Sequence, residues 1–287
     1  MENYADRIGT AREALLEAEH IVIGAGSGLS TAAGLDYGGQ RFAANFADFI
    51  ARYPDLGDNM YSASFYPFGT PEELWAHWAR HIMVNRFDPP ALPLYKALLD
   101  FVSRKNFFVI TTNADGQFEK AGFPRERLFV VQGDYAYIQC ARACHKKLYW
   151  DRDIIEKMAG SISDCRVPSA LVPRCPVCGG PMDINLRKDE FFVEDDAWHD
   201  ASRRYSDYMK EIAAGKFVLL ELGVGFNTPA IIRYPFEQIA HEAKDALLVR
   251  LNRDNPEGPW ENEKKTIAFD EDMAQVLTDL AAAGSLY

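Results

Sequence analysis

Hydrophobic positions along the chain follow two periods that alternate from end to end. Short apolar runs rich in β-branched or aromatic residues predict strands buried on both faces of a parallel sheet. Helical spacing fills the intervals, as in residues 5–18, where Ile8, Ala11, Leu15 and Ala18 recur on one face. The expected strands span residues 21–23, 107–112, 128–131, 216–222, 246–251 and 266–269.

Helix start signals are clearest between the first two strands. Thr70 can cap a helix whose first position is Pro71, and this helix is expected to run through Met83 until Pro89 and Pro90. Residues 92–101 predict another helix, and Asp270 is expected to cap the last one. The interval between the first two strands, about 80 residues, is longer than a doubly wound domain needs. Residues 38–104 therefore predict a helical insertion packed over the turn after the first strand.

Glycines crowd the turn that follows the first strand. Gly24, Ala25 and Gly26 lead into a helix expected from Leu29. Bare backbone and the N–H groups of a helix start favour a bound phosphate. The usual G-x-G-x-x-G spacing is absent, because Leu29 stands at the third glycine position and no acidic residue clearly ends a second strand. A tight turn without a ligand is the alternative.

Polar side chains follow several of the other expected strands. Asn113 and Asp115 come after the second strand, and Gln132 comes after the third. A second glycine turn begins at Gly223, and Asn252 follows the next strand. In open parallel sheets ligands bind outside the carboxyl ends of the strands. Because Asn and Asp also cap helices routinely, ligand binding and capping both stay open for Asn113 and Asp115.

The cysteines predict a metal site. Two pairs with ligand-like spacing lie 30 residues apart, and the second pair sits in a knuckle that ends in glycines, as in a zinc ribbon. Four thiolates would close the tetrahedron, so the zinc would be structural. Cys165 is left over, His145 could replace a neighbouring sulfur, and free thiols are the alternative. The expected ligands are Cys140, Cys144, Cys175 and Cys178.

His77 and His81 lie one helical turn apart and could in principle clamp a metal. No cysteine is near them in the sequence, and the H-E-x-x-H pattern is absent. A surface or packing role is favoured over a metal site.

Composition limits the partners and the compartment. The 287 residues carry a net charge of −11, which argues against general binding to nucleic acid or to an anionic membrane. No apolar run reaches the ~18 residues of a membrane-spanning helix, and residues 1–10 lack the core of a signal peptide, so a cytoplasmic location is expected. The odd number of clustered cysteines argues against a disulfide framework.

Taken in order, the motifs resemble those of the sirtuins over most of the chain. GAGSGLSTAAGLDY is similar to GAGxSxxSGIPDF, with two residues inserted and the proline missing. TTNADGQF resembles TQNIDxLH, VQGDY stands at the L-H-G strand end, LGVGFNTP resembles G-T-S-x-x-V-x-P, and VRLNRD resembles the late I-N strand end. The cysteine pairs match the family's zinc module. The resemblance implies an α/β protein with a Rossmann-like parallel sheet that binds NAD (residues 1–134 and 191–287), a helical insertion, and an inserted small zinc-binding module (residues 135–190).

The resemblance also implies roles for individual residues. Asn113 would orient the ribose or an attacking group, Asp115 would hold the nicotinamide carboxamide, and Gln132 would hold a ribose hydroxyl. The two glycine turns would bind the pyrophosphate, Asn252 would lie near the adenosine ribose, and Asp36 and Tyr37 would lie over the nicotinamide side. The implied NAD site comprises Gly24, Ala25, Gly26, Asp36, Tyr37, Asn113, Asp115, Gln132, Gly223, Val224, Gly225, Asn227, Asn252 and Arg253, with Asn113 and Gln132 as the catalytic residues.

Three departures from the family pattern bear on the reaction. Gln132 replaces the histidine that acts as general base in deacylation, and an amide cannot take up a proton near neutral pH. Val224 and Gly225 replace the hydroxyls of the G-T-S loop, and residues 191–195 replace the F-G-E segment that pairs with acetyl-lysine peptides. This pattern looks like that of the macrodomain-linked class of microbial sirtuins.

That class implies an NAD-dependent protein ADP-ribosyltransferase with NAD and zinc as its cofactors. The acceptor would be a lipoylated carrier protein related to the glycine cleavage H protein, and a macrodomain protein is a candidate partner. Two alternatives stay open. One is an NAD-dependent deacylase with a different base, and the other is a catalytically silent NAD-binding sensor.

Overall fold

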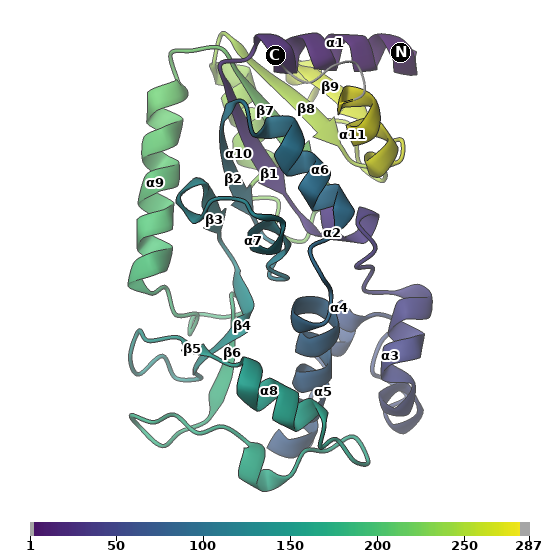
Figure 1. Cartoon of the computed structure of the whole chain (residues 1–287), viewed down its shortest axis with the longest axis vertical. Coiled ribbons are helices and arrows are strands. Elements are labelled where there is room, and N and C mark those ends of the chain that lie inside the picture. Colours follow the sequence, from purple (N-terminus) through teal and green to yellow (C-terminus); the bar gives the residue numbers. More distant parts are fainter. Residues whose placement is uncertain (1–2, 282–287) are drawn as a thin grey trace.

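A six-stranded parallel sheet forms one half of the protein in the computed structural model, which describes residues 3–281 (Figure 1). The strand order is β3-β2-β1-β7-β8-β9, and every neighbouring pair is parallel. All the strands expected from the apolar runs are confirmed, with only their ends adjusted. They are β1 (His20–Ala25), β2 (Asn106–Thr111), β3 (Leu128–Val130), β7 (Phe217–Leu222), β8 (Ala246–Leu251) and β9 (Thr266–Phe269).

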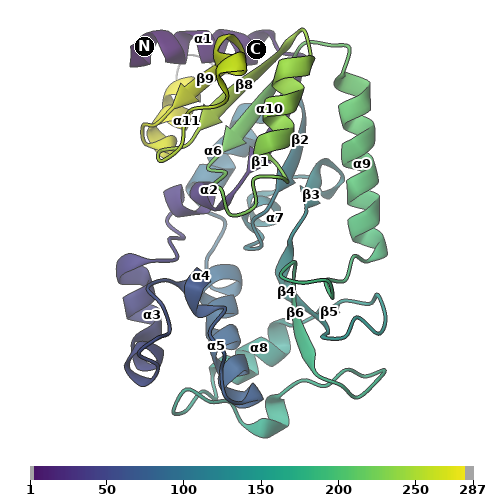
Figure 2. The ribbon, with the colours of Figure 1, turned by 180° about the vertical axis from the view of Figure 1, so that it is seen from behind.

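Helices cover both faces of this sheet, because successive strand residues point to opposite sides. Ile21 and Ile23 of β1 pack with one group of helices, whereas Val22 packs with the other. The first group is α1 (Tyr4–Glu17), α2 (Ser27–Ala32), α6 (Pro93–Val102), α7 (Gln117–Ala121) and α11 (Met273–Ala281). The second is α9 (Asp196–Ile212) and α10 (Arg233–Glu242), which face the viewer in Figure 2.

The other half of the protein combines the helical insertion with the cysteine-containing segment. Phe46, Phe49 and Trp75 of the insertion share one hydrophobic core with Ile155 and Ile184 of that segment. The insertion contributes α3 (Gly39–Arg52), α4 (Met60–Ala63), α5 (Pro71–Ile82) and the π-helix η1 (Met83–Phe87). The cysteine-containing segment contributes β4 (Gly133–Cys140), β5 (Tyr149–Trp150), α8 (Arg152–Ala159) and β6 (Met182–Leu186). Short 3₁₀ turns complete the chain at η2 (Arg125–Arg127), η3 (Ser169–Leu171) and η4 (Trp260–Lys265).

The helix signals of the sequence are tested at three places. Thr70 Oγ1 accepts from the N–H of Glu73, whose carboxylate accepts from the N–H of Thr70, so the expected start of α5 is confirmed as a capping box. Helix α6 lies within residues 38–104 but packs on the sheet. The expectation that Asp270 caps the last helix is wrong. Helix α11 begins later, and Asp272 Oδ1 accepts from the N–H of Gln275 at 2.9 Å.

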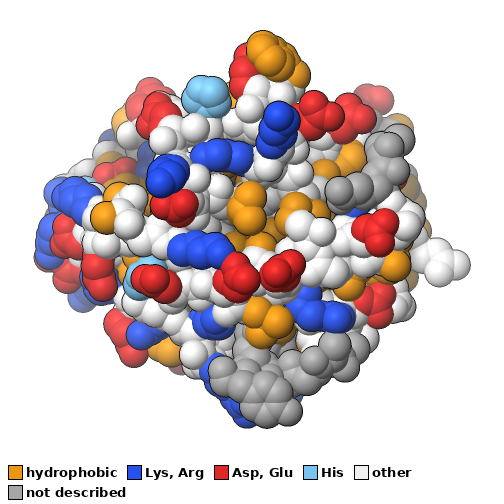
Figure 3. All heavy atoms as spheres, turned by 90° about the horizontal axis from the view of Figure 1, so that it is seen from above, with side chains coloured by type: hydrophobic (Ala, Val, Ile, Leu, Met, Phe, Trp, Pro, Cys, Tyr) orange, Lys and Arg blue, Asp and Glu red, His pale blue; other side chains and the backbone are white. Residues whose placement is uncertain are grey.

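Figure 3 shows the face that lies uppermost in Figure 1. On that face acidic and basic side chains are interspersed, and neither sign gathers into a patch. Within residues 3–281, no helix has both the length and the apolar character needed to cross a membrane.

Candidate active site at the carboxyl edge of the sheet

Backbone hydrogen bonds carry the sheet register past the strand ends and bring the predicted site residues to one edge. Each of these bonds involves a residue that directly precedes a predicted site residue. The site residues are Asn113, Gln132, Gly26, Gly223 and Asn252. The bonds run from Val131 N to Thr111 O (2.9 Å), Thr112 N to Ala25 O (3.1 Å), Gly26 N to Leu222 O (3.0 Å) and Gly223 N to Leu251 O (2.9 Å). Residues far apart in the sequence therefore share the edge at which parallel sheets bind ligands.

The two glycine turns touch each other through their backbones. The N–H of Gly28 donates to Gly223 O at 3.0 Å, and a Cβ on Gly26 would lie 2.6 Å from the same oxygen. Gly223 has a φ of +61°, and a Cβ there would lie 2.5 Å from the Cα of Gly28. Glycine is required at these positions for the turns to pack this closely.

These turns fit the pyrophosphate of NAD. The N-cap of α2 is Gly26, which supplies no side-chain hydrogen bond to the helix start. N–H groups at such a start favour an anion. Those of Gly28 and Leu29 are already bonded to Gly223 O and Gly26 O, which leaves the N–H of Ser27 for a ligand. Gly225 and Asn227 of the second turn are exposed, so the ligand's phosphates would be approached by backbone and not by the hydroxyls of a G-T-S loop.

Asn113 is held by its amide nitrogen. Nδ2 donates to Gly26 O at 2.9 Å and lies 3.1 Å from Ser30 Oγ and 3.4 Å from the Tyr95 hydroxyl. Its Oδ1 has no hydrogen-bond partner among the described residues. A half-buried carbonyl oxygen in a fixed position at the sheet edge is suited to accept a hydrogen bond from a ligand hydroxyl.

Asp115 has both carboxylate oxygens engaged. Oδ1 accepts from the N–H of Gln117 at 2.9 Å, at the start of α7, and Oδ2 accepts from the Ser30 hydroxyl. Burial raises the pKa of this carboxyl, whereas the two donors lower it. Each oxygen keeps a second lone pair, so Asp115 can still accept from a carboxamide N–H while it orders the start of α7.

The side chains of the remaining predicted residues differ in whether they already make hydrogen bonds within the protein. The Gln132 side chain is half-buried and makes no hydrogen bond to the rest of residues 3–281, while its carbonyl accepts from Arg187 N at 3.0 Å. Asn252, in contrast, uses its amide to hold Val224 O (2.8 Å) and the N–H of Asn255 (3.0 Å). Asn252 therefore orders the two loops around it, and Arg253 is exposed beside Asp254.

Asp36 and Tyr37 lie in the loop between α2 and α3. The Asp36 carboxylate is exposed and accepts from the N–H of Gly38 at 3.0 Å. The Tyr37 hydroxyl lies 3.0 Å from that of Tyr135, two residues after Gly133. This contact joins the loop to the first strand of the cysteine-containing segment.

Sequence reasoning missed three residues around Asn113, Asp115 and Tyr37. Ser30 and Tyr95 complete the buried cluster of hydroxyls under Asn113, and Tyr135 is the partner of Tyr37. Ser30 is a buried polar residue one turn into the helix that follows the glycines, which is a signal that could have been used. Tyr95 and Tyr135 carry no such signal, because aromatic residues are also expected in a core.

The four expected zinc ligands come together. Their sulfur atoms all lie within 4.8 Å of one another, with Cys140 and Cys178 separated by 3.7 Å and Cys144 and Cys175 by 3.6 Å. Four sulfurs at about 2.3 Å from one zinc ion would be about 3.7–3.8 Å apart, so the cluster fits a tetrahedral zinc site.

The pKa shifts within the cluster differ from one cysteine to another, since those of Cys140 and Cys175 are lowered whereas burial and the neighbouring thiols raise that of Cys144. Burial alone would raise the pKa of the Cys140 thiol, but the N–H groups of Cys144 and Arg142 and the neighbouring thiols lower it to about 6. His145 Nδ1 lies 3.0 Å from Cys144 Sγ, and its Nε2 lies 2.9 Å from the Tyr149 hydroxyl, so this histidine is a neighbour of the sulfurs and replaces none of them. Cys165 is buried elsewhere in the same core.

His77 and His81 are buried among aromatic rings, which confirms the packing interpretation. Phe46, Phe49 and Phe68 surround His77, and the ring of His81 lies 4.9 Å from that of Tyr135. Burial lowers the pKa of His77 to about 3, so it is neutral at physiological pH. No third ligand joins the two histidines within the described residues.

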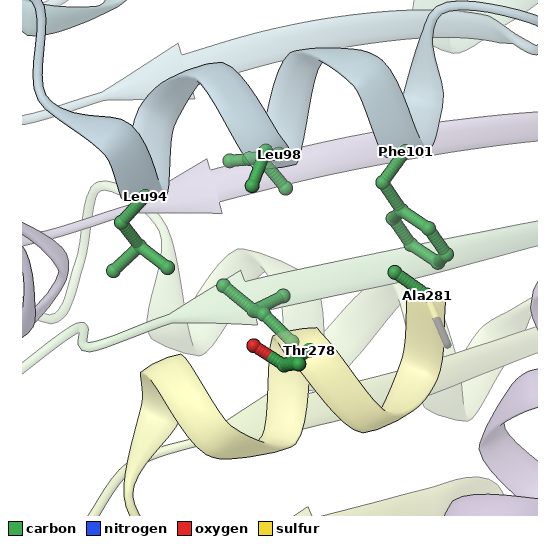
Figure 4. A pocket seen from close by; sticks show the side chains of 7 residues that line it. Leu94, Leu98, Phe101, Thr278 and Ala281 are labelled. Carbon is green, nitrogen blue, oxygen red and sulfur yellow. The ribbon is translucent and has the colours of Figure 1, made fainter.

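An apolar groove of about 270 Å³ lies between α6 and α11, apart from the edge just described (Figure 4). Leu94, Leu98, Phe101 and Ala281 line it, with no residue of the implied NAD site among them.

Comparison with known proteins gives the family. No protein-family model matches. A protein ADP-ribosyltransferase of Staphylococcus aureus (strain Mu50) is 35% identical over 279 residues, which cover 97% of this chain and 88% of that protein. The chain belongs to the sirtuin family. This sirtuin is an NAD-dependent enzyme, and the predicted activity is confirmed at the level of a sirtuin-type ADP-ribosyltransferase.

Solved structures confirm the sirtuin fold. A Sir2 homolog–NAD complex has a TM-score of 0.57 at 13% identity and covers 96% of this chain and 92% of its own. Sir2Tm bound to a propionylated peptide has a TM-score of 0.56 at 19% identity and covers 98% of this chain and 99% of its own.

A probable bifunctional ADP-ribose hydrolase/ADP-ribosyltransferase of Fusarium oxysporum f. sp. cubense is 30% identical over 284 residues. This sirtuin spans only 45% of the Fusarium protein.

Proposed function

We propose that this sirtuin transfers ADP-ribose from NAD to a protein, and that the acceptor is a lipoylated carrier related to the glycine cleavage H protein. The observation that supports transfer most strongly is the residue type at position 132. Gln132 places an amide at the strand end next to Asn113, where a deacylase needs a general base. The motif resemblance to the macrodomain-linked class supports the carrier. A macrodomain protein that removes ADP-ribose is the proposed partner.

The sheet edge supplies what such a transfer requires. Departure of nicotinamide leaves an oxocarbenium-like ribose, so the enzyme must hold the sugar in line with the acceptor and keep water away. Asn113 Oδ1 and the Gln132 amide would bind ribose hydroxyls, and Asp115 would hold the carboxamide of the leaving group. An acceptor group that is already deprotonated, such as a carboxylate, can attack the ribose without giving up a proton, so no residue at position 132 has to take one.

In the segment that replaces F-G-E, backbone groups are already hydrogen-bonded to side chains of the same protein. Gln139 Nε2 donates to Phe191 O at 2.7 Å, and the N–H of Val193 donates to Gln139 Oε1 at 2.9 Å. The Val193 carbonyl accepts from Asn185 Nδ2 at 3.2 Å. An extended peptide binds by strand addition only where backbone groups are free, so this segment disfavours such docking.

Acetyl-lysine peptides are therefore expected to be poor substrates. Without a general base the rate of deacetylation should be about 10²–10⁴-fold below that of a sirtuin with the L-H-G histidine. Gln132→His alone should not restore deacetylation, because the side chains of Gln139 and Asn185 would still be hydrogen-bonded to the backbone of residues 191–193. Mass spectrometry of the peptide after incubation with NAD measures the rate. Deacetylation by the wild type as fast as by such a sirtuin would contradict the proposal and favour the deacylase alternative.

The acceptor is tested by incubating the enzyme with labelled NAD and carrier proteins. The lipoylated carrier should gain the mass of ADP-ribose, and the same carrier without its lipoyl group serves as the matched control. Equal modification of both forms would show that the enzyme does not recognise the lipoyl group. Absence of both nicotinamide release and modified protein would instead support the silent sensor.

A further inference from the structure

Arg86 links the two loops that carry Asn113 and Gln132. It lies in the π-helix η1, a helix type that is rare and often found at functional sites. Its guanidinium binds the Asp134 carboxylate through two bonds, Nε to Oδ1 at 2.7 Å and Nη2 to Oδ2 at 3.0 Å. Asp134 is two residues after Gln132, so this bidentate pair holds the start of β4 beside Gln132.

The same guanidinium also contacts the loop after Asn113. Its Nη2 lies 3.3 Å from Glu119 Oε2, and its carbon packs against the backbone of Gly116, where a Cβ would lie only 2.2 Å away. Gly116 has a φ of +66°, so both its conformation and this contact require glycine. Lys120 strengthens the link by donating to the carbonyls of Arg86 and Pro89.

Arg86 is buried at the centre of this linkage, and its carboxylate partners are half-buried. The Arg86 side chain is 6% exposed and that of Asp134 is 15% exposed. Within the described residues, a single backbone hydrogen bond joins the two loops directly, from Tyr135 N to Ala114 O at 3.0 Å. A planar guanidinium with two parallel bonds fixes orientation as well as distance, which a single backbone bond does not.

We propose that Arg86 is a positioning residue that holds segments 113–119 and 132–134 in one arrangement, so that Asn113 and Gln132 face the same ribose. This inference rests on the proposed use of those two side chains in ADP-ribose transfer. In this proposal Arg86 acts through Asp134 and Gly116, and not by touching the NAD or the acceptor. Its loss should leave NAD bound by the glycine turns but misalign the sugar, and such a displacement can cost about 10²-fold in rate.

The test compares Arg86→Met with Arg7→Met. Arg7 pairs with Glu271 and donates to the Ala268 carbonyl, so its variant also loses a partly buried arginine–carboxylate pair, but one that joins α1 to the chain before α11. Arg86→Met should lower kcat for transfer by about 10²-fold with KM for NAD little changed, whereas Arg7→Met should keep kcat. Arg86→Lys should not rescue the rate, because an ammonium group cannot bind both oxygens in the guanidinium's geometry.

Two further measurements keep the result interpretable. Asp134→Asn keeps the side-chain shape, so if Arg86→Met fails to fold this variant should show the same fall in kcat at constant KM. Hydrogen exchange needs no activity, and segments 113–119 and 132–137 should exchange faster in Arg86→Met than in Arg7→Met. Unchanged exchange, or a folded Arg86→Met variant with wild-type kcat for nicotinamide release, would overturn the proposal. A wild type that releases nicotinamide but modifies no protein would defeat the proposed function alone.

Discussion

Asn113→Ala is expected to reduce ADP-ribose transfer by about 10²–10³-fold, the loss seen when one fixed polar group facing a developing charge is removed. Its Nδ2 is held by Gly26 O and Ser30, which points the unpartnered Oδ1 to the edge where the ribose would lie. Alanine removes that acceptor. The side chain is half-buried and carries little packing, so the protein should still fold.

Asn106→Ala is the matched control for this variant. Asn106 begins the same strand at the opposite edge of the sheet, where its amide bonds to His20 and Arg127. Both variants lose amide hydrogen bonds, one in the first residue of β2 and one just after its last, so similar thermal stability with different transfer rates would assign the loss to the site. Gln132→Ala should cost about 1–3 kcal/mol of transition-state binding if its ribose bonds are buried. Transfer at the wild-type rate by both Asn113→Ala and Gln132→Ala would refute the catalytic assignment.

The strands could be predicted because the information is local. A strand buried on both faces is apolar at nearly every position, and β1 and β8 fit this pattern apart from His20 and Arg250. The zinc ligands were equally accessible, since each pair is held together by a few residues of chain. Both predictions used only the identities of near neighbours in the sequence.

Contacts across long stretches of sequence could not be predicted in the same way. Glu221 interrupts an apolar run, but nothing near it shows that Arg250 lies beside it in the register and binds it at 2.8 and 2.9 Å. The helical insertion was expected over the glycine turn, yet its aromatic residues share a core with the cysteine-containing segment. An amphipathic helix shows that it has a buried face, and not which partner covers it.

In the candidate site too, the residue types could be predicted from the sequence, but the residues that contact them could not. Motif order located Asn113, Asp115 and Gln132, because the ends of parallel strands converge whatever the loops do. Which atoms stay free for a ligand depends on neighbours such as Ser30 and Tyr95, which come from separate helices. Asn252 is expected near the adenosine ribose, and no sequence pattern indicated that its amide also bonds the surrounding loops.

Cys178→Ser is expected to abolish zinc binding and to unfold the half of the protein that contains the cysteines. Structural zinc supplies about 10–16 kcal/mol of apparent binding energy in small domains, which is as large as the whole net stability of a typical protein. Cys140 and Cys175 belong to the core that the helical insertion shares, so loss of the metal should also disorder α3 and α5. Transfer of ADP-ribose should be lost with them.

Cys165→Ala is the matched control, because Cys165 is buried in the same core but lies outside the metal cluster. Elemental analysis should find one zinc ion per chain in the wild type and in Cys165→Ala, and none in Cys178→Ser. A chelator should lower the melting temperature of the first two proteins, and should leave that of the third unchanged. Wild-type protein that contains no zinc when purified without chelator, or that melts at the same temperature after its zinc is removed, would show that the four thiols hold this half of the protein together without a metal.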